Sequence, residues 1–138
     1  MSITPRQISI VQDSFRSVEP IAEQAADIFY TTLFGYDPTL KPLFKNDIKA
    51  QGKKLMTTLK VAVNGLNNLD KLVPVLHQLA ERHVGYGVKA ADFTPVGNAL
   101  LHTLKTGLGD AFTDELREAW VEVIRLVATT MKEHSFPE

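Results

Sequence analysis

The chain has 138 residues, of which 44% are hydrophobic, and a formal net charge of −1. These values predict a single domain over residues 1–138 with a substantial core, and no basic stripe that could follow phosphates, so we expect no nucleic-acid partner. The chain has no cysteine, which excludes disulfides, thiolate metal ligands and cysteine nucleophiles.

Apolar residues recur mainly at three- and four-residue spacing, which predicts helices along the whole chain. Thr4-Pro5 marks the start of the first helix, because Thr is a good cap and proline suits the first helical position. A second helix starts at Glu19-Pro20 and extends to Gly35. Pro38 and Pro42 then forbid a long helix, so we expect a corner of short turns.

Three further helices are predicted in the middle of the chain. Asp47 can cap a helix that reaches Gly65, and the next helix begins near Asp70 and ends at a glycine-rich bend beginning at Gly85. Asp92 is expected to cap a third helix, which stops at the segment Gly107-Leu108-Gly109.

Thr113 is expected to cap the last helix, which extends past Trp120 to Met131. Six substantial helices and a short one at the corner favour an all-α fold other than a symmetric bundle. No apolar stretch approaches the roughly 20 residues that span a bilayer, and the first residues lack a signal-peptide pattern. We therefore expect a cytoplasmic protein that does not enter a membrane.

The segment Glu81-Arg82-His83-Val84-Gly85-Tyr86-Gly87 is the most informative motif. Together with Leu43-Phe44 at the proline corner and the later pair Ala119-Trp120, it resembles neuroglobins and their single-domain bacterial relatives, which are related to the globin domain of flavohaemoglobins. The resemblance covers essentially the whole chain. It implies a globin fold with six long helices and short helical turns around a haem pocket, and haem b as cofactor.

The resemblance places the proximal iron ligand at His83. Haem chemistry needs a neutral imidazole whose Nε2 reaches the iron while the other ring nitrogen bonds a carbonyl or a carboxylate. Without the surrounding motif, a histidine at a helix end would more often be an ordinary surface residue. His77, His102 and His134 match no metal-binding motif, and we expect no ligand role for them.

On the opposite side of the haem, the family's distal tyrosine and glutamine positions match Tyr30 and Gln51. Both side chains carry hydrogen-bond donors, which stabilise bound O₂ more than CO because O₂ draws electron density from ferrous iron. Leu55, one turn beyond Gln51, matches the residue that shapes the distal pocket.

Apolar residues at further family positions would contact the haem ring, where haem packing and core packing follow the same physics. These residues are Phe44, Leu79, Val88, Phe93 and Val96. Lys53, Lys54, Arg82 and Lys89 are candidate partners of the haem propionates, although an exposed, solvated charge is an equally good interpretation of each.

The sequence departs from its relatives at two places. Neuroglobins have a histidine where Gln51 stands, so we expect a five-coordinate or weakly closed iron, with Lys54 or Tyr30 as conceivable internal ligands. Flavohaemoglobins orient the proximal histidine with a tyrosine and a glutamate. Phe93 occupies the first of these positions, and Ser135, near Glu133, lies close to the second.

The resemblance implies reversible binding of diatomic gases (O₂, CO, NO) for storage, scavenging or transport. The alternatives are nitric oxide dioxygenation with an external reductase, since the 138 residues contain no Rossmann fingerprint, and a gas or redox sensor. We expect a monomer or a weak dimer.

Overall fold

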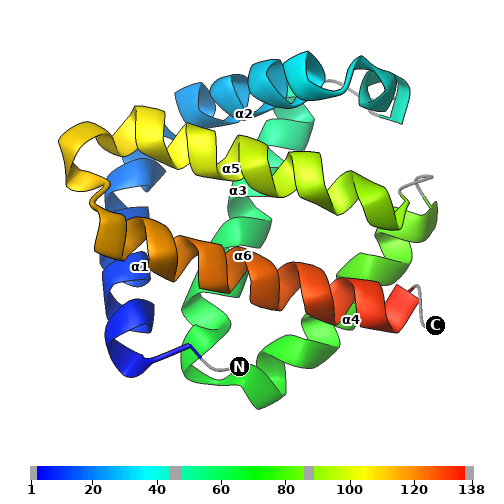
Figure 1. Ribbon diagram of the computed structural model, residues 1–138. Helices are drawn as coiled ribbons and strands as arrows, with labels where there is room; N and C mark the ends of the chain where they lie inside the picture. Colours follow the sequence, from blue (N-terminus) through cyan, green and yellow to red (C-terminus); the bar gives the residue numbers. More distant parts are fainter. Residues whose placement is uncertain (1–2, 44–47, 86–88, 136–138) are drawn as a thin grey trace.

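The computed structural model describes residues 3–43, 48–85 and 89–135, and over these ranges all regular structure is helical (Figure 1). The α-helices are α1 (Pro5–Val18), α2 (Ala22–Tyr36), α3 (Ile48–Asn64), α4 (Leu69–Gly85), α5 (Phe93–Leu108) and α6 (Asp114–Ser135). The 3-10 turns are η1 (Glu19–Ile21), η2 (Pro38–Leu43), η3 (Gly65–Asn67), η4 (Ala90–Asp92) and η5 (Gly109–Ala111). The predicted six long helices and the short turn at the proline corner are confirmed.

Helix ends follow the predicted capping residues at most positions. The Thr4 side chain accepts a hydrogen bond from the Gln7 backbone N–H at 3.1 Å, and Gln7 Oε1 accepts one from the Thr4 N–H at 3.0 Å. The Thr113 hydroxyl accepts from the Leu116 N–H at 3.2 Å at the start of α6. Helix α5 ends at Gly109, whose φ of +56° lies in a region that side chains with a Cβ disfavour.

Asp92 occupies the predicted N-cap position of α5, but its side chain does not cap the helix. Its carboxylate makes no cap bond to α5 and instead accepts a hydrogen bond from the Lys89 N–H at 2.9 Å. The turn η4 leads directly into α5, so Asp92 already has helical dihedral angles and its side chain reaches back to the N–H that precedes the turn. Asp47, the cap predicted for α3, lies outside the described residues.

The helices cross at uneven angles and do not form a bundle (Figure 1). Helix α2 packs on α5 and α3, α4 packs on α6, and α1 contacts α6 and α3. In the figure α5 and α6 run side by side across the front, with α2 above them and α3 behind. In the described ranges no helix is long and apolar enough to cross a membrane.

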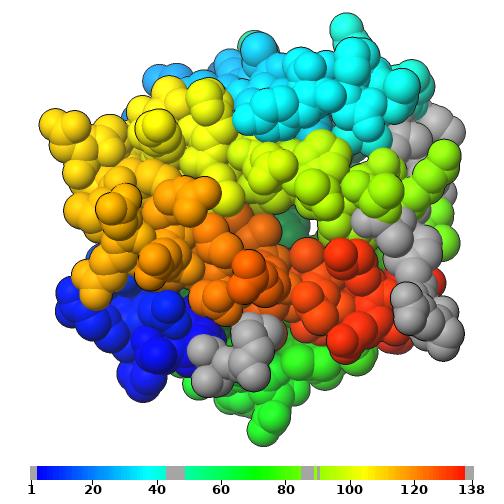
Figure 2. Space-filling view, in the orientation of Figure 1, coloured from blue at the N-terminus to red at the C-terminus, as the bar shows by residue number. Residues whose placement is uncertain are grey.

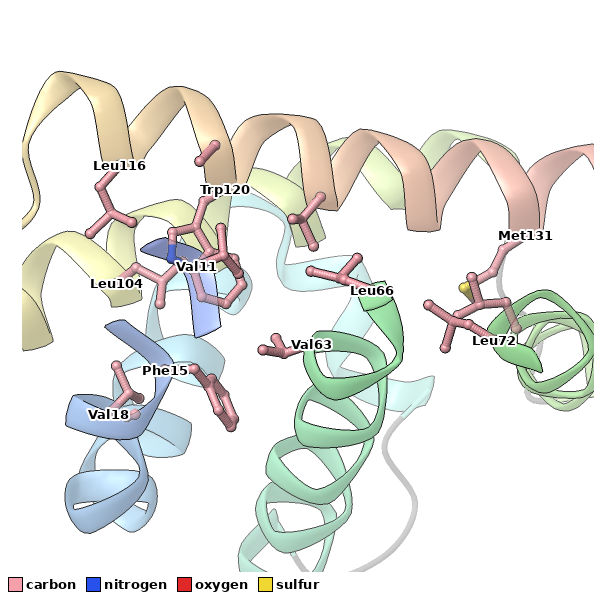
Figure 3. Packing of buried hydrophobic residues seen from close by; sticks show 14 of the residues in the cluster. Val11, Phe15, Val18, Val63, Leu66, Leu72, Leu104, Leu116, Trp120 and Met131 are labelled. Carbon is pink, nitrogen blue, oxygen red and sulfur yellow. The ribbon is translucent and has the colours of Figure 1, made fainter. Parts of the chain in front are cut away.

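Most of the buried apolar residues that the structure describes fall into two clusters. The larger one draws residues from all six α-helices, mainly α1, α4 and α6, and contains Phe15, Val63 and Trp120, whose ring centroid lies 6.4 Å from that of Phe15 (Figure 3). Trp120 Nε1 donates to Ser14 Oγ at 2.9 Å, and Ser14 Oγ donates to the Val11 carbonyl, so this buried polar pair is satisfied.

The smaller cluster, called the α2–α5 cluster below, contains Phe29, Tyr30, Leu33, Leu40 and Ala99, with Phe34, Leu55, Val96 and Leu100 packed against it. A cavity of about 20 Å³ lies where the two clusters meet. Its walls include Phe29, Leu55 and Leu100 on one side and Trp120 on the other. The α2–α5 cluster holds several of the residues that the sequence assigned to the ligand pocket.

Candidate functional site

Helices α2 and α3 approach each other unusually closely at Gly52. A Cβ at this position would lie 2.8 Å from the Cβ of Ala26 and 4.0 Å from the ring of Tyr30. Real Cβ atoms do not approach at 2.8 Å, so the glycine is what allows this crossing. Gln51, the preceding residue, is half-buried at the same crossing. The crossing therefore fixes the position of Gln51 relative to the helix that carries Tyr30.

Tyr30 is the buried polar residue of the α2–α5 cluster, with 5% of its surface exposed. Its ring packs edge-on against Phe29 at 5.0 Å between centroids and stacks on Phe34 at 6.0 Å. Burial raises the pKa of Tyr30 from 10.0 to about 12, because the phenolate would lose its hydration. Like any tyrosine phenol, the Tyr30 side chain carries its proton at neutral pH and can donate a hydrogen bond; burial extends this state to higher pH.

Two more of the predicted pocket residues pack beside Tyr30. Leu55 from α3 and Val96 from α5 both contact the α2–α5 cluster. Leu55 lies one turn beyond Gln51 on α3. The structure thus brings Tyr30, Leu55 and Val96 together. Gln51 lies on α3, the same helix that carries Leu55.

His83 lies near the end of α4 and is half-buried. Its Nδ1 is 2.8 Å from the backbone carbonyl oxygen of Leu79, one turn earlier. Since a carbonyl can only accept, Nδ1 carries the proton, and in the neutral ring Nε2 is the nitrogen with the lone pair. This is the arrangement that an imidazole ligand of iron requires.

The other described residues predicted to contact the haem ring do not pack in the α2–α5 cluster. Leu79 and Phe93 pack against the larger cluster, whereas Phe44 and Val88 lie outside the described residues. The predicted propionate partners Lys53, Lys54, Arg82 and Lys89 are all exposed, and no described acidic side chain forms an ion pair with them.

The positions compared with the flavohaemoglobin proximal network lie at the start of α5 and the end of α6. Phe93 packs its apolar ring on the larger cluster, and Glu133 is exposed. Ser135 Oγ is buried and has no hydrogen-bond partner within the part of the chain that the structure covers.

Sequence reasoning missed a cluster of side chains that links α4 to α6. His134 Nε2 lies 2.7 Å from Glu81 Oε2, and the rings of His77 and His134 stack with centroids 4.2 Å apart and planes 9° from parallel. The spacing of His77 and Glu81, four residues apart on one helix, was a usable signal, but the contribution of α6 could not be read from it. Among the described residues, no three or more His, Cys, Asp or Glu side chains are arranged to hold a metal ion.

The unevenly crossing helices, the half-buried His83 with its Nδ1 held by a carbonyl, and the buried Tyr30 are consistent with the class of helical haem proteins. The chain belongs to the globin family, whose model matches residues 27–131. Haem is the cofactor expected of a globin.

Curated relatives fall into two groups. The chain is 37% identical to a flavohemoprotein from Oceanobacillus iheyensis over 103 residues, which are 72% of this chain and 25% of that protein. It is 27% identical to a neuroglobin from Danio rerio over 143 aligned positions, covering 94% of this chain and 90% of that protein. The aligned part of the chain therefore spans 25% to 30% of the length of these flavohemoproteins and 90% of the neuroglobin.

A solved structure of a hexacoordinated heme protein from an anhydrobiotic tardigrade at pH 4 has the same fold. The TM-score is 0.87 over 96% of this chain and 94% of the other, at 21% sequence identity.

Proposed function

We propose that this protein binds haem b through His83 and reversibly binds O₂, as well as CO and NO, beside Tyr30 and Gln51. The observation that carries the proposal is the protonated phenol of Tyr30, buried in an apolar cluster next to the crossing that positions Gln51. The other element of the proposed site, His83, lies on a different helix, and its Nδ1 contact with the Leu79 carbonyl makes Nε2 the nitrogen with the lone pair, which supports the proposed ligand role.

The residues present fit a haem group. An imidazole nitrogen is a suitable iron ligand, and apolar walls formed by Leu55, Leu79, Val96 and Phe93 suit a macrocycle. Phe44 and Val88 are proposed to complete these walls, and Lys54 and Arg82 to bind the propionates. Bound haem would supply a ferrous iron that takes up a diatomic gas and donates electron density to it.

The chain's own contribution is a pair of donors in a dry pocket. A hydrogen bond from Tyr30 or Gln51 strengthens where the gas carries partial negative charge, so O₂ gains more than CO. One such bond is worth about 1–3 kcal/mol, which corresponds to about 5- to 150-fold in the dissociation rate. Leu55 adds no donor and limits the space beside the gas.

The test is stopped-flow measurement of O₂ and CO dissociation from the ferrous, haem-loaded protein and its Tyr30→Phe variant. We expect O₂ dissociation to accelerate by about tenfold or more while CO dissociation changes little. Tyr36→Phe is the matched control, because Tyr36 lies six residues further along α2 and is 53% exposed. Unchanged O₂ dissociation in Tyr30→Phe would show that the distal assignment is wrong.

Iron ligation is tested separately by haem retention and spectra. His83→Ala should lose haem on gel filtration, whereas His102→Ala, an exposed histidine on α5, should retain it. A broad, single-band deoxy-ferrous spectrum is expected, because Gln51 is a poor iron ligand. A split six-coordinate spectrum that disappears in Lys54→Gln would instead assign an internal ligand to Lys54.

A second candidate function is nitric oxide dioxygenation, favoured by the 37% identity to the flavohemoprotein. In this reaction NO, O₂ and one electron give nitrate, and the electron would come from a separate flavin-containing reductase. The assay follows NO loss and nitrate formation over many turnovers with NADH and such a reductase. If only one nitrate formed per haem, reversible gas binding would remain the proposed function. Sustained nitrate formation would establish dioxygenation.

A further inference from the structure

A groove of about 360 Å³ lies on the outer side of α5, away from the α2–α5 cluster. Asn98, Leu101, His102 and Lys105 line it from α5, and Tyr36, Phe112 and Arg117 line it from the neighbouring segments. The α5 residues are spaced three or four apart and so share one face of the helix. Figure 2 shows α5 crossing the front of the molecule between α2 above and the start of α6 below.

The charged side chains of this groove are all basic. Lys105 and Arg117 are exposed lining residues, and none of the acidic residues in the described ranges lines the groove. Elsewhere the described arginines Arg6 and Arg125 pair with glutamates. Lys105 and Arg117 form no ion pair or side-chain hydrogen bond with any residue that the structure describes. The groove is therefore a locally positive site on a chain whose net charge is −1.

Aromatic and apolar surface lies beside these cations. Tyr36 is 53% exposed, the largest value among the exposed large hydrophobic residues described, and Phe112 and Leu101 are half-buried. An exposed tyrosine ring offers a flat face to a planar ligand, and arginine and lysine bind carboxylates and phosphates. The volume falls in the range of about 300–1,000 Å³ that is usual for small-molecule sites.

We propose that this groove binds a small organic anion that contains an aromatic ring. The ring packs against Tyr36 and Phe112, and its carboxylate or phosphate is bound by Lys105 and Arg117. The site is separate from the haem pocket, because Ala99 and Leu100, on the opposite side of α5, belong to the α2–α5 cluster. The proposal therefore does not depend on which gas the haem binds.

The test is an NMR titration of the haem-loaded, CO-bound protein, which is diamagnetic, with 2-naphthoate as the probe. We expect saturable amide shifts confined to the segments that line the groove, which are residues 98–105, residues 111–117 and the end of α2 around Tyr36, and no comparable shifts with acetate, which lacks the ring. The neutral 2-naphthamide should bind about tenfold more weakly or not at all, because it lacks the charge. Affinity should fall as salt concentration rises.

Lys105→Gln combined with Arg117→Gln should weaken 2-naphthoate binding by about tenfold or more, and Tyr36→Ser should also weaken it. Lys71→Gln combined with Lys132→Gln removes the same charge elsewhere and should leave the affinity unchanged. Equal binding of 2-naphthamide, or shifts that are non-saturable or spread beyond the segments that line the groove, would overturn the proposal. Localised shifts with polyglutamate but none with 2-naphthoate would also overturn it and identify the groove as a docking surface for an acidic chain.

Discussion

Gly52→Ala should separate α3 from α2 and thereby disturb the ligand pocket. The new Cβ would lie 2.8 Å from the Cβ of Ala26, whereas carbon atoms in contact are usually about 3.5–4.0 Å apart. The helices must move apart locally by about 1 Å, and overpacking of this kind costs about 1–3 kcal/mol. Since Gln51 and Leu55 lie on α3, we expect faster O₂ dissociation as well as lower stability.

Alanine also favours a helix over glycine by about 1 kcal/mol, and this gain must be separated from the steric cost. Gly35→Ala on α2 provides the reference, because nothing lies within 4 Å of a Cβ at that position. Gly52→Ala should be less stable than Gly35→Ala by about 1–3 kcal/mol. Ala26→Gly removes the clashing atom, so the double variant with Gly52→Ala should recover most of this loss.

The assay is guanidinium denaturation of the haem-loaded protein at fixed haem concentration, together with stopped-flow O₂ dissociation. The unmodified protein, Gly52→Ala, Ala26→Gly and their double variant form a double-mutant cycle in which the Ala26–Gly52 coupling is measured directly. Equal stabilities of Gly52→Ala and Gly35→Ala, or a coupling near zero, would refute the claim that this crossing requires glycine.

Two further predictions concern buried polar groups. The unfolded chain releases the Tyr30 proton near pH 10.0, whereas the folded protein keeps it to about pH 12. The free energy of unfolding should therefore decrease between these pH values, by about 2–3 kcal/mol, and Tyr30→Phe should lack this component in alkaline denaturation. Ser14→Ala leaves the buried Trp120 N–H without its partner and should cost about 1–3 kcal/mol in urea denaturation.

Each of the two predictions, on Tyr30 and on Ser14, has a result that would contradict it. An identical alkaline profile in Tyr30→Phe would mean that burial does not hold the phenol proton. For Ser14→Ala the comparison is Arg6→Gln, which breaks an exposed ion pair with Glu115 and should leave the denaturation midpoint unchanged. If both variants had the same stability, the Ser14–Trp120 hydrogen bond would have no net effect.

The sequence predicted most helix boundaries because the signals are local. A capping threonine, a proline at the first helical position and a glycine at the end each act within one turn, as at Thr4 and Gly109. Asp92 stands at the predicted N-cap position, but its side chain makes no cap bond because the turn η4 continues into α5, which a single residue does not reveal. The close approach at Gly52 and the contact of Glu81 with His134 depend on residues far apart in the chain, so local patterns could not predict them.

The site itself was predicted from family resemblance, and the structure adds physical observations on some of the predicted residues. The hydrogen bond from His83 Nδ1 to Leu79 and the burial of Tyr30 follow from helix geometry and packing. Phe44 and Val88 lie in the ranges 44–47 and 86–88, outside the described residues, so their contacts with the haem stay predictions.

The cavity between the two clusters makes the protein sensitive to hydrostatic pressure. Unfolding eliminates internal voids, so compression favours the unfolded chain in proportion to the void volume, here about 20 Å³ for this cavity. Before unfolding, compression acts on the walls, which include Leu55 from the ligand pocket and Trp120, the only tryptophan of the chain. Indole emission thus reports on compression at the wall that the ligand pocket shares with the core.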